Sequence, residues 1–251
     1  MNEAKFTGKA NIYSKYRPSY PDGFMEYLYS EVGITKESVI ADIGSGTGIL
    51  TDLLLRQNSC VYGVEPNKDM RNIAEKELSG YNNFVSVNAS AENTGLLNNS
   101  VDYITVAQAF HWFDRIKFKS ECKRILKSQG KVILVWNSRD DKSELVMKNE
   151  SINRRFCPDF KGFSDGMRGE SPEEYSDFFK DGICEYKTFR YDLMFDEDSF
   201  IGRNMSASYA PERGDSNYEP YILALKKLYE QYSVSGSLCM PNITKSYVGE
   251  V

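Results

Sequence analysis

The sequence predicts an α/β fold in which a mostly parallel β-sheet carries helices on both faces. Two observations support this prediction. Up to about residue 130, short β-prone runs alternate with longer segments whose apolar residues recur at helical spacing. The first of these runs also ends in a glycine-rich segment that leads directly into a helical one. Repeated alternation of strand and helix is typical of a parallel sheet, because parallel strands need a crossover connection that is usually a helix.

Five strands are expected in this first part, at residues 39–43, 61–65, 83–87, 101–107 and 131–136. The first is an apolar run interrupted only by Asp42, as expected of a strand covered on both faces. Helices are expected at residues 49–56, from 66 to about 78 and at 117–127, where apolar residues have helical spacing. Pro66 suits a helix start, because its missing N–H costs no hydrogen bond there. Gly130 is the expected stop of the third helix.

The pattern becomes less regular after Asn137. Helices are expected from residue 140 to about 155, at 198–205 and at 218–232, and strands at 185–194 and 243–248. The strand at 185–194 is predicted from its β-prone side chains Tyr186, Phe189 and Tyr191. Since the chain has no internal repeat and no low-complexity linker, we expect this part to continue the same sheet and to carry an inserted cap.

Composition limits the possible functions. The 251 residues carry a net charge of −5, which argues against a general nucleic-acid binder with a basic face. No stretch approaches the roughly 18 apolar residues of a membrane span, and the first residues lack an apolar signal core, so we expect a cytoplasmic protein without a membrane partner. A single histidine, five scattered cysteines and no assignable carboxylate cluster predict no metal site. No feature of the sequence predicts an oligomeric state.

The run Asp42-Ile43-Gly44-Ser45-Gly46-Thr47-Gly48 joins the first strand to the first helix. Glycines let the backbone approach a ligand closely, and the following helix offers free N–H groups. The spacing is one residue tighter than the Gly-x-Gly-x-x-Gly that holds a dinucleotide pyrophosphate. The carboxylate of Asp42 is unfavourable beside a pyrophosphate but suits a ligand that carries an ammonium group. Glu65, at the end of the second strand, is placed to accept hydrogen bonds from ribose hydroxyls.

Together these features resemble the class I S-adenosylmethionine-dependent methyltransferases, most closely the small-molecule branch that includes trans-aconitate methyltransferase and its relatives. Residues 13–21, 90–92, 107–114 and 205–209 also carry the likeness. The resemblance implies a Rossmann-like fold with a seven-stranded, mostly parallel sheet and a helical cap inserted after the fifth strand. It divides a single domain, residues 1–251, into a cofactor-binding half at 1–137, the cap and late sheet elements at 138–240, and a closing strand at 241–251.

The resemblance also implies the residues of the site. The cofactor S-adenosyl-L-methionine is expected to contact Tyr13, Arg17, Asp42, Gly44, Ser45, Gly46, Glu65, Pro66, Met70, Ser90, Ala91, Glu92, Ala107 and Gln108. The expected substrate residues are His111, Trp112, Arg203 and Tyr209. His111 is also the candidate catalytic base, since histidine titrates near neutral pH. As an alternative, the aromatic residues around His111 serve only packing, and Asp114 caps the next helix. Arg203 and Arg213 are candidates for binding an acidic substrate.

We therefore expect a methyltransferase that moves a methyl group to an O or N atom of a small molecule. A carboxylate is a candidate acceptor, and it needs no base because it is already ionised at pH 7. A nicotinamide-dependent oxidoreductase is an alternative that the tight glycine spacing disfavours. A protein or nucleic-acid methyltransferase is disfavoured by the acidic charge and by the absence of an Asn-Pro-Pro-Tyr or Asp-Pro-Pro-Tyr signature at the fourth strand. A non-catalytic protein that binds S-adenosylmethionine is a further alternative.

Overall fold

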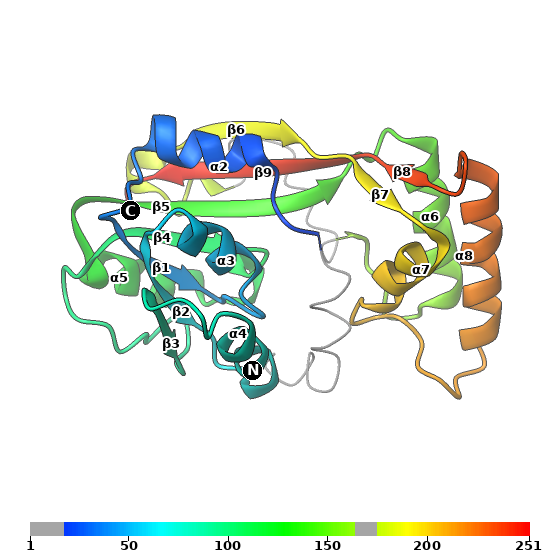
Figure 1. Cartoon of the computed structure of the whole chain (residues 1–251), viewed down its shortest axis with the longest axis horizontal. Helices are drawn as coiled ribbons and strands as arrows, with labels where there is room; N and C mark the ends of the chain where they lie inside the picture. Colours follow the sequence, from blue (N-terminus) through cyan, green and yellow to red (C-terminus); the bar gives the residue numbers. More distant parts are fainter. Residues whose placement is uncertain (1–17, 164–174) are drawn as a thin grey trace.

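The computed structural model describes residues 18–163 and 175–251. Its main sheet has seven strands in the order β3-β2-β1-β4-β5-β9-β6. β1 pairs in parallel with β2 and β4, as do β2 with β3 and β4 with β5, whereas β9 runs antiparallel to both of its neighbours, β5 and β6. A mostly parallel sheet of seven strands is thus confirmed, and Figure 1 shows its strands one above another, from β6 at the top to β3 at the bottom.

The elements follow one another along the chain in this order. The strands are β1 Val39–Ile43, β2 Cys60–Val64, β3 Phe84–Val87, β4 Val101–Ala107, β5 Leu126–Arg139, β6 Glu185–Arg190, β7 Leu193–Phe195, β8 Leu238–Met240 and β9 Asn242–Gly249. The helices are α2 Asp22–Tyr27, α3 Ile49–Arg56, α4 Lys68–Glu77, α5 Arg115–Ile125, α6 Glu144–Phe156, α7 Glu197–Met205 and α8 Tyr218–Tyr232, with shorter turns η2 Leu28–Val32, η3 Phe110–Trp112 and η6 Lys180–Gly182.

Several predicted element boundaries are wrong, among them that of β5, which was expected at residues 131–136 and spans Leu126–Arg139. Helix α4 begins after Pro66, because Asn67 is its N-cap and accepts hydrogen bonds from the backbone N–H groups of Asp69 and Met70. Helix α5 ends at Ile125 rather than before Gly130, since Leu126 already pairs with Val101 in the sheet. The single strand expected at residues 185–194 is two strands, of which β6 belongs to the main sheet and β7 pairs with β8 in a second one. The elements α2, η2 and β8 were not predicted.

The side chains of β5 show how the sheet separates two cores. Val132, Leu134 and Trp136 pack on the face that is covered by α5, whereas Ile133 and Val135 pack on the face covered by α2, α3 and α4. This alternation follows from the two-residue period of a strand. Because both faces are covered there, residues 132–136 form a continuous apolar run, as expected for the interior of a parallel sheet.

A separate apolar cluster holds α6, α7 and α8 together with β7 and β8, and we call this part the cap. Figure 1 shows the cap beyond the end of the sheet toward which the arrow of β5 points. The cap therefore lies at the carboxyl ends of the parallel strands. None of the helices that the structure describes is long and apolar enough to cross a membrane.

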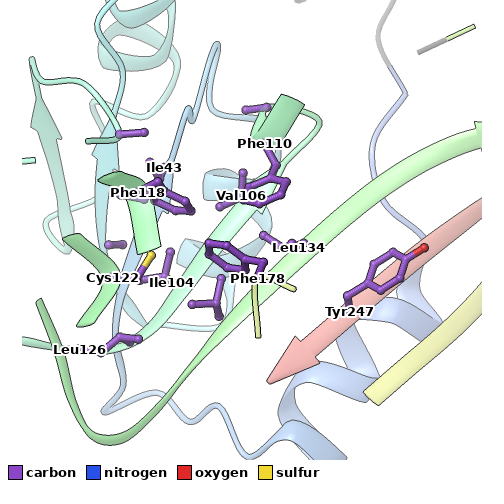
Figure 2. Close-up of a cluster of buried hydrophobic side chains, with 14 of the residues drawn as sticks. Ile43, Ile104, Val106, Phe110, Phe118, Cys122, Leu126, Leu134, Phe178 and Tyr247 are labelled. Carbon is purple, nitrogen blue, oxygen red and sulfur yellow. The ribbon is translucent and has the colours of Figure 1, made fainter. Parts of the chain in front are cut away.

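Phe118 on α5 provides a test of the core between the sheet and α5. Its ring is fully buried and contacts the rings of Phe110, Phe113 and Phe178, as Figure 2 shows for two of these partners. We expect Phe118→Ala to lower the free energy of unfolding by about 3–5 kcal/mol, because the substitution leaves a cavity. Urea denaturation measures the change. Ile116→Ala in the same helix is the control, since Ile116 is 82% exposed and its truncation should change the free energy by less than about 0.5 kcal/mol. Equal losses in the two variants would contradict this packing.

Candidate functional site

The strand order reverses between β1 and β4, and a cavity opens at their carboxyl ends. Ligands of open α/β sheets bind at such a switch point, because the two connections leave the sheet in opposite directions there. The sheet side of the cavity is lined by Gly44, Ser45, Gly46, Thr47, Ile49, Leu50, Ala107, Gln108, His111 and Trp112. Further lining comes from Pro18, Tyr20, Asn137, Arg139, Phe163, Arg203, Ala207, Ser208 and Tyr209.

The glycine loop has a conformation that side chains would obstruct. Gly44 has a φ of +69°, and a Cβ there would lie 2.6 Å from that of Ala109. Gly48 has a φ of +85°, and its Cβ would lie 2.8 Å from Leu78. The N–H groups of Gly44 and Ser45 both donate to the carbonyl of Val64 in β2. The loop is therefore held in place by the neighbouring strand and by close packing before any ligand arrives.

Asp42 is a buried carboxylate at the end of β1. Its carboxylate is only 1% exposed and accepts hydrogen bonds from the hydroxyls of Thr51 on α3, at 2.6 Å, and Thr105 on β4, at 2.8 Å. Burial raises the pKa of Asp42 to about 6, against the lowering effect of the two hydroxyls. The side chain does not line the cavity. Asp42 thus joins β1, β4 and α3 beneath the glycine loop, and its contact with a cofactor stays a prediction.

Glu65 is the second buried carboxylate at this edge. One oxygen accepts from the N–H of Gly46 at 3.0 Å, and the other accepts from the N–H of Asn67 at 2.7 Å. Burial raises the pKa of Glu65, and these two backbone bonds oppose the rise. A carboxylate offers about four lone-pair positions. Glu65 therefore orders the loop. It does not line the cavity itself, and its contact with ribose hydroxyls stays a prediction.

Gln108 and Asn137 connect the site to the rest of the sheet. Gln108 follows β4 with a φ of +59°, and its side-chain amide donates to the carbonyl of Asn137. The Asn137 amide in turn donates to the carbonyl of Ser19 and accepts from the hydroxyl of Thr244 on β9. Asn137 was not predicted as a site residue, because its partners lie 118 and 107 residues away.

His111 and Trp112 lie on η3 and line the cavity beside each other, with ring centroids 4.5 Å apart. Phe110 in the same turn points the other way, into the core. Asp114 caps α5 by accepting the N–H of Lys117, as the packing alternative expected. The segment therefore serves both packing and the lining of the cavity.

The cap side of the cavity wall carries two arginines, Arg203 on α7 and Arg139 at the end of β5. Tyr209 also lines the wall, as expected. Among the described lining residues, these arginines are the charged ones apart from the titratable His111, and no carboxylate accompanies them. Arg213, the other predicted candidate, lies outside the cavity, and its guanidinium is near the hydroxyl of Tyr218. Arg139 was not predicted, because its place beside Arg203 depends on how the cap folds back.

The remaining predicted residues that the structure describes do not line this cavity. Ala91 is buried in the core on the α5 side of the sheet, and the Glu92 carboxylate accepts a hydrogen bond from the N–H of Asp114. Ser90, Pro66 and Met70 do not line the cavity either, and the N–H of Met70 is bound by Asn67. Tyr13 and Arg17 lie outside the described residues.

Comparison with known proteins gives a consistent result. A family model described as a methyltransferase domain matches residues 41–134. An uncharacterized methyltransferase-like protein of Schizosaccharomyces pombe is 32% identical over 152 residues, which cover 60% of this chain and 58% of the relative. An uncharacterized methyltransferase of Mycobacterium tuberculosis is 34% identical over 137 residues, covering 55% of this chain and 54% of the relative. The chain thus spans little more than half the length of these curated relatives.

Residues 41–134 thus match a methyltransferase domain model, and the relatives that share this part of the chain are described as methyltransferases. The fold extends well beyond that match, since a candidate type II methyltransferase of Anaeromyxobacter dehalogenans has a TM-score of 0.68 at 20% identity, covering 94% of this chain and 98% of its own. A phosphoethanolamine N-methyltransferase of Haemonchus contortus, solved with S-adenosylhomocysteine, has a TM-score of 0.57 at 15% identity, covering 100% of this chain and 59% of its own. None of these four proteins is named as a trans-aconitate methyltransferase, so membership of that branch stays a prediction. S-adenosylmethionine is the cofactor of this class of domain.

The glycine loop of this methyltransferase domain fits that cofactor. The hydroxyl of Thr47 lines the cavity, is buried, and has no hydrogen-bond partner within the described part of the chain. A buried polar group without a partner is costly, and a polar ligand can satisfy it. A Cβ on Gly46 would meet nothing within 4 Å. The loop thus leaves both space and an unsatisfied polar group on the side that faces the cavity.

The buried charge of Asp42 predicts a pH dependence of stability. Its pKa is about 6 in the folded domain and 3.8 when unperturbed, so the folded state binds the proton more tightly. Protonation therefore stabilises the fold below pH 3.8, and this contribution is lost as the pH rises through about 6. We expect the wild type to lose up to about 3 kcal/mol relative to Asp42→Asn between pH 4 and pH 7. Urea unfolding of both proteins across this range measures it, and parallel curves would contradict the prediction.

Proposed function

We propose that this protein transfers a methyl group from S-adenosylmethionine to an O or N atom of a small anionic molecule. The observation that carries the proposal is the composition of the two cavity walls. The glycine loop and Gln108 form one wall, and Arg139 and Arg203 stand in the other. The first wall suits the cofactor of the domain class, and the second suits an acceptor with negative charge.

We infer that a carboxylate is the preferred acceptor. Guanidinium groups bind carboxylates with strong, charge-assisted and often bidentate hydrogen bonds. Both Arg139 and Arg203 line the cavity, so their positive charge borders the space that an acceptor would occupy. A small molecule is favoured over a macromolecule because cap residues, namely Phe163, Ala207, Ser208 and Tyr209, enclose the side opposite the sheet.

The chain's own residues bind and orient the reactants in this proposal. The cofactor supplies an activated methyl group on a sulfonium sulfur. Glu65 and the glycine loop hold the nucleoside end, and the aromatic face of Trp112 suits a positive charge nearby. A carboxylate acceptor is ionised at pH 7 and needs no base. His111 then orients the acceptor against the cavity wall, and alignment of the reacting atoms provides most of the rate enhancement.

Calorimetry with S-adenosylhomocysteine tests the cofactor half of the proposal. We expect binding at sub-millimolar concentration, weakened about tenfold or more by Glu65→Gln, because hydrogen bonds to a charged group contribute about 1.5–3 kcal/mol. Glu77→Gln is the control, since Glu77 is an exposed residue of the nearby helix α4 and should leave the dissociation constant unchanged. Absence of binding to the wild type would overturn the proposed function.

The acceptor half is tested with isotopically labelled S-adenosylmethionine and a panel of small carboxylic acids with their primary amides. Mass spectrometry should detect the labelled methyl group on acids but not on the matching amides. We expect Arg203→Met to lower kcat/KM for the acids at least about tenfold, because a charged partner of the acceptor is lost. Arg213→Met, which changes an exposed cap arginine outside the cavity, should retain the wild-type value. Amides methylated as efficiently as the acids would overturn the preference for a carboxylate, and acids that carry no label would exclude a carboxylate acceptor.

A further inference from the structure

A chain of buried polar side chains runs through the middle of the cap. Asn149 and Asn153 on α6 are fully buried, as is Tyr221 on α8, and Asn204 on α7 is 3% exposed. All four lie among the apolar side chains that hold the three cap helices together. Amide groups in such surroundings are costly unless they are hydrogen-bonded, so their arrangement is a specific feature of the cap.

The hydrogen bonds of these residues all run in one direction. The Tyr221 hydroxyl donates to Asn153 at 2.6 Å, the Asn153 amide donates to Asn149 at 3.2 Å, and the Asn149 amide donates to Asn204 at 3.1 Å. The Asn204 amide then donates to the carbonyl of Phe200, one turn earlier on α7. Each side-chain oxygen and at least one N–H of each amide is thus used. The chain links all three cap helices, and hydrogen bonds in such a series reinforce one another.

This chain restricts how α7 can turn against α6. Successive residues of a helix point about 100° apart, so a small rotation of α7 would take the Asn204 side chain away from Asn149. The rotation would leave both amides buried without their partners, whereas apolar contacts alone tolerate such repacking more easily. The hydrogen-bond chain therefore selects one rotation of α7 from several that the apolar contacts would allow.

Arg203 is the residue next to Asn204 on α7, and its side chain lines the acceptor cavity. Asn204 itself lines a second, small cavity that both Arg139 and Arg203 border. The rotation that places Asn204 against α6 is thus the one that places Arg203 at the cavity. We propose that the chain Tyr221–Asn153–Asn149–Asn204 is a positioning device that directs Arg203 into the acceptor cavity and thereby contributes to acceptor specificity. Its link to specificity rests on the function proposed above.

Two matched substitutions on α8 test the proposal. Tyr221→Phe removes the first donor of the chain and keeps the ring. Tyr229→Phe removes an equally short hydrogen bond of the same helix, from the Tyr229 hydroxyl to the carbonyl of Gly236 at 2.6 Å, outside the chain. The readout is the side-chain Nε–H resonance of Arg203 in NMR spectra of the full chain, assigned by its loss in Arg203→Lys. We expect Tyr221→Phe to shift or broaden this resonance and Tyr229→Phe to leave it in place.

Each variant loses one hydrogen bond of α8. If the hydrogen-bond chain only stabilised the cap, both substitutions would therefore change the Arg203 resonance alike. No change of the Arg203 resonance in Tyr221→Phe, or the same change in both variants, would overturn the proposal.

A second measurement uses the wild type and so does not depend on how well the variants fold. The side-chain amide protons of Asn149, Asn153 and Asn204 should exchange with solvent far more slowly than those of the exposed Asn98, and fast exchange would also overturn it.

S-adenosylhomocysteine calorimetry on the same samples separates this inference from the proposed function. We expect Tyr221→Phe to bind S-adenosylhomocysteine like the wild type, because the hydrogen-bond chain lies in the cap and not in the glycine loop. If the wild type fails to bind it, the proposed function fails while the Arg203 resonance still decides the positioning role. If binding is normal and the resonance is unaffected, the positioning role alone fails.

Discussion

The site depends on one buried interaction, the carboxylate of Asp42 between the hydroxyls of Thr51 and Thr105. It joins the two strands between which the sheet order reverses, and it also holds the helix that follows the glycine loop. Burying this charge is unfavourable, as its raised pKa shows. The two hydroxyls offset part of that cost, and in return the loop is anchored from below while Glu65 and Val64 hold it from the side. The cofactor wall is therefore formed before a ligand binds.

The two walls of the cavity have different physical origins. The sheet wall consists mostly of backbone and small side chains, whose positions follow from strand pairing. The cap wall carries the positive charge, and Arg139 and Arg203 reach it from elements far apart in the sequence. Asn137, which also lines the cavity, ties the sheet wall together, because it bonds to Gln108 after β4, to Thr244 on β9 and to the chain at Ser19. In the function proposed above, the sheet wall holds the cofactor and the cap wall binds the acceptor.

Most strands of the sheet could be predicted because each is specified locally. β1, β4, α3 and α8 begin and end where the apolar pattern places them. The errors arose where a tertiary contact outweighed the local signal. Leu126 leaves the expected helix to pair with Val101, and the strand expected at residues 185–194 divides where the chain passes from the main sheet into the cap. β8 has three residues and exists only because β7 pairs with it.

The sequence by itself determined the fold class, the glycine loop and the edge of the sheet at which ligands bind. Parallel strands bring their carboxyl ends to one edge, so residues that follow different strands meet there whatever the details of packing. Only the tertiary structure decided that Asp42 faces the interior, that Thr47 has an unsatisfied hydroxyl among the described residues, and that Arg139 rather than Arg213 accompanies Arg203. These facts depend on side-chain direction and on the packing of the cap helices, which distant contacts such as those of Asn149 and Tyr221 fix and which no local pattern encodes.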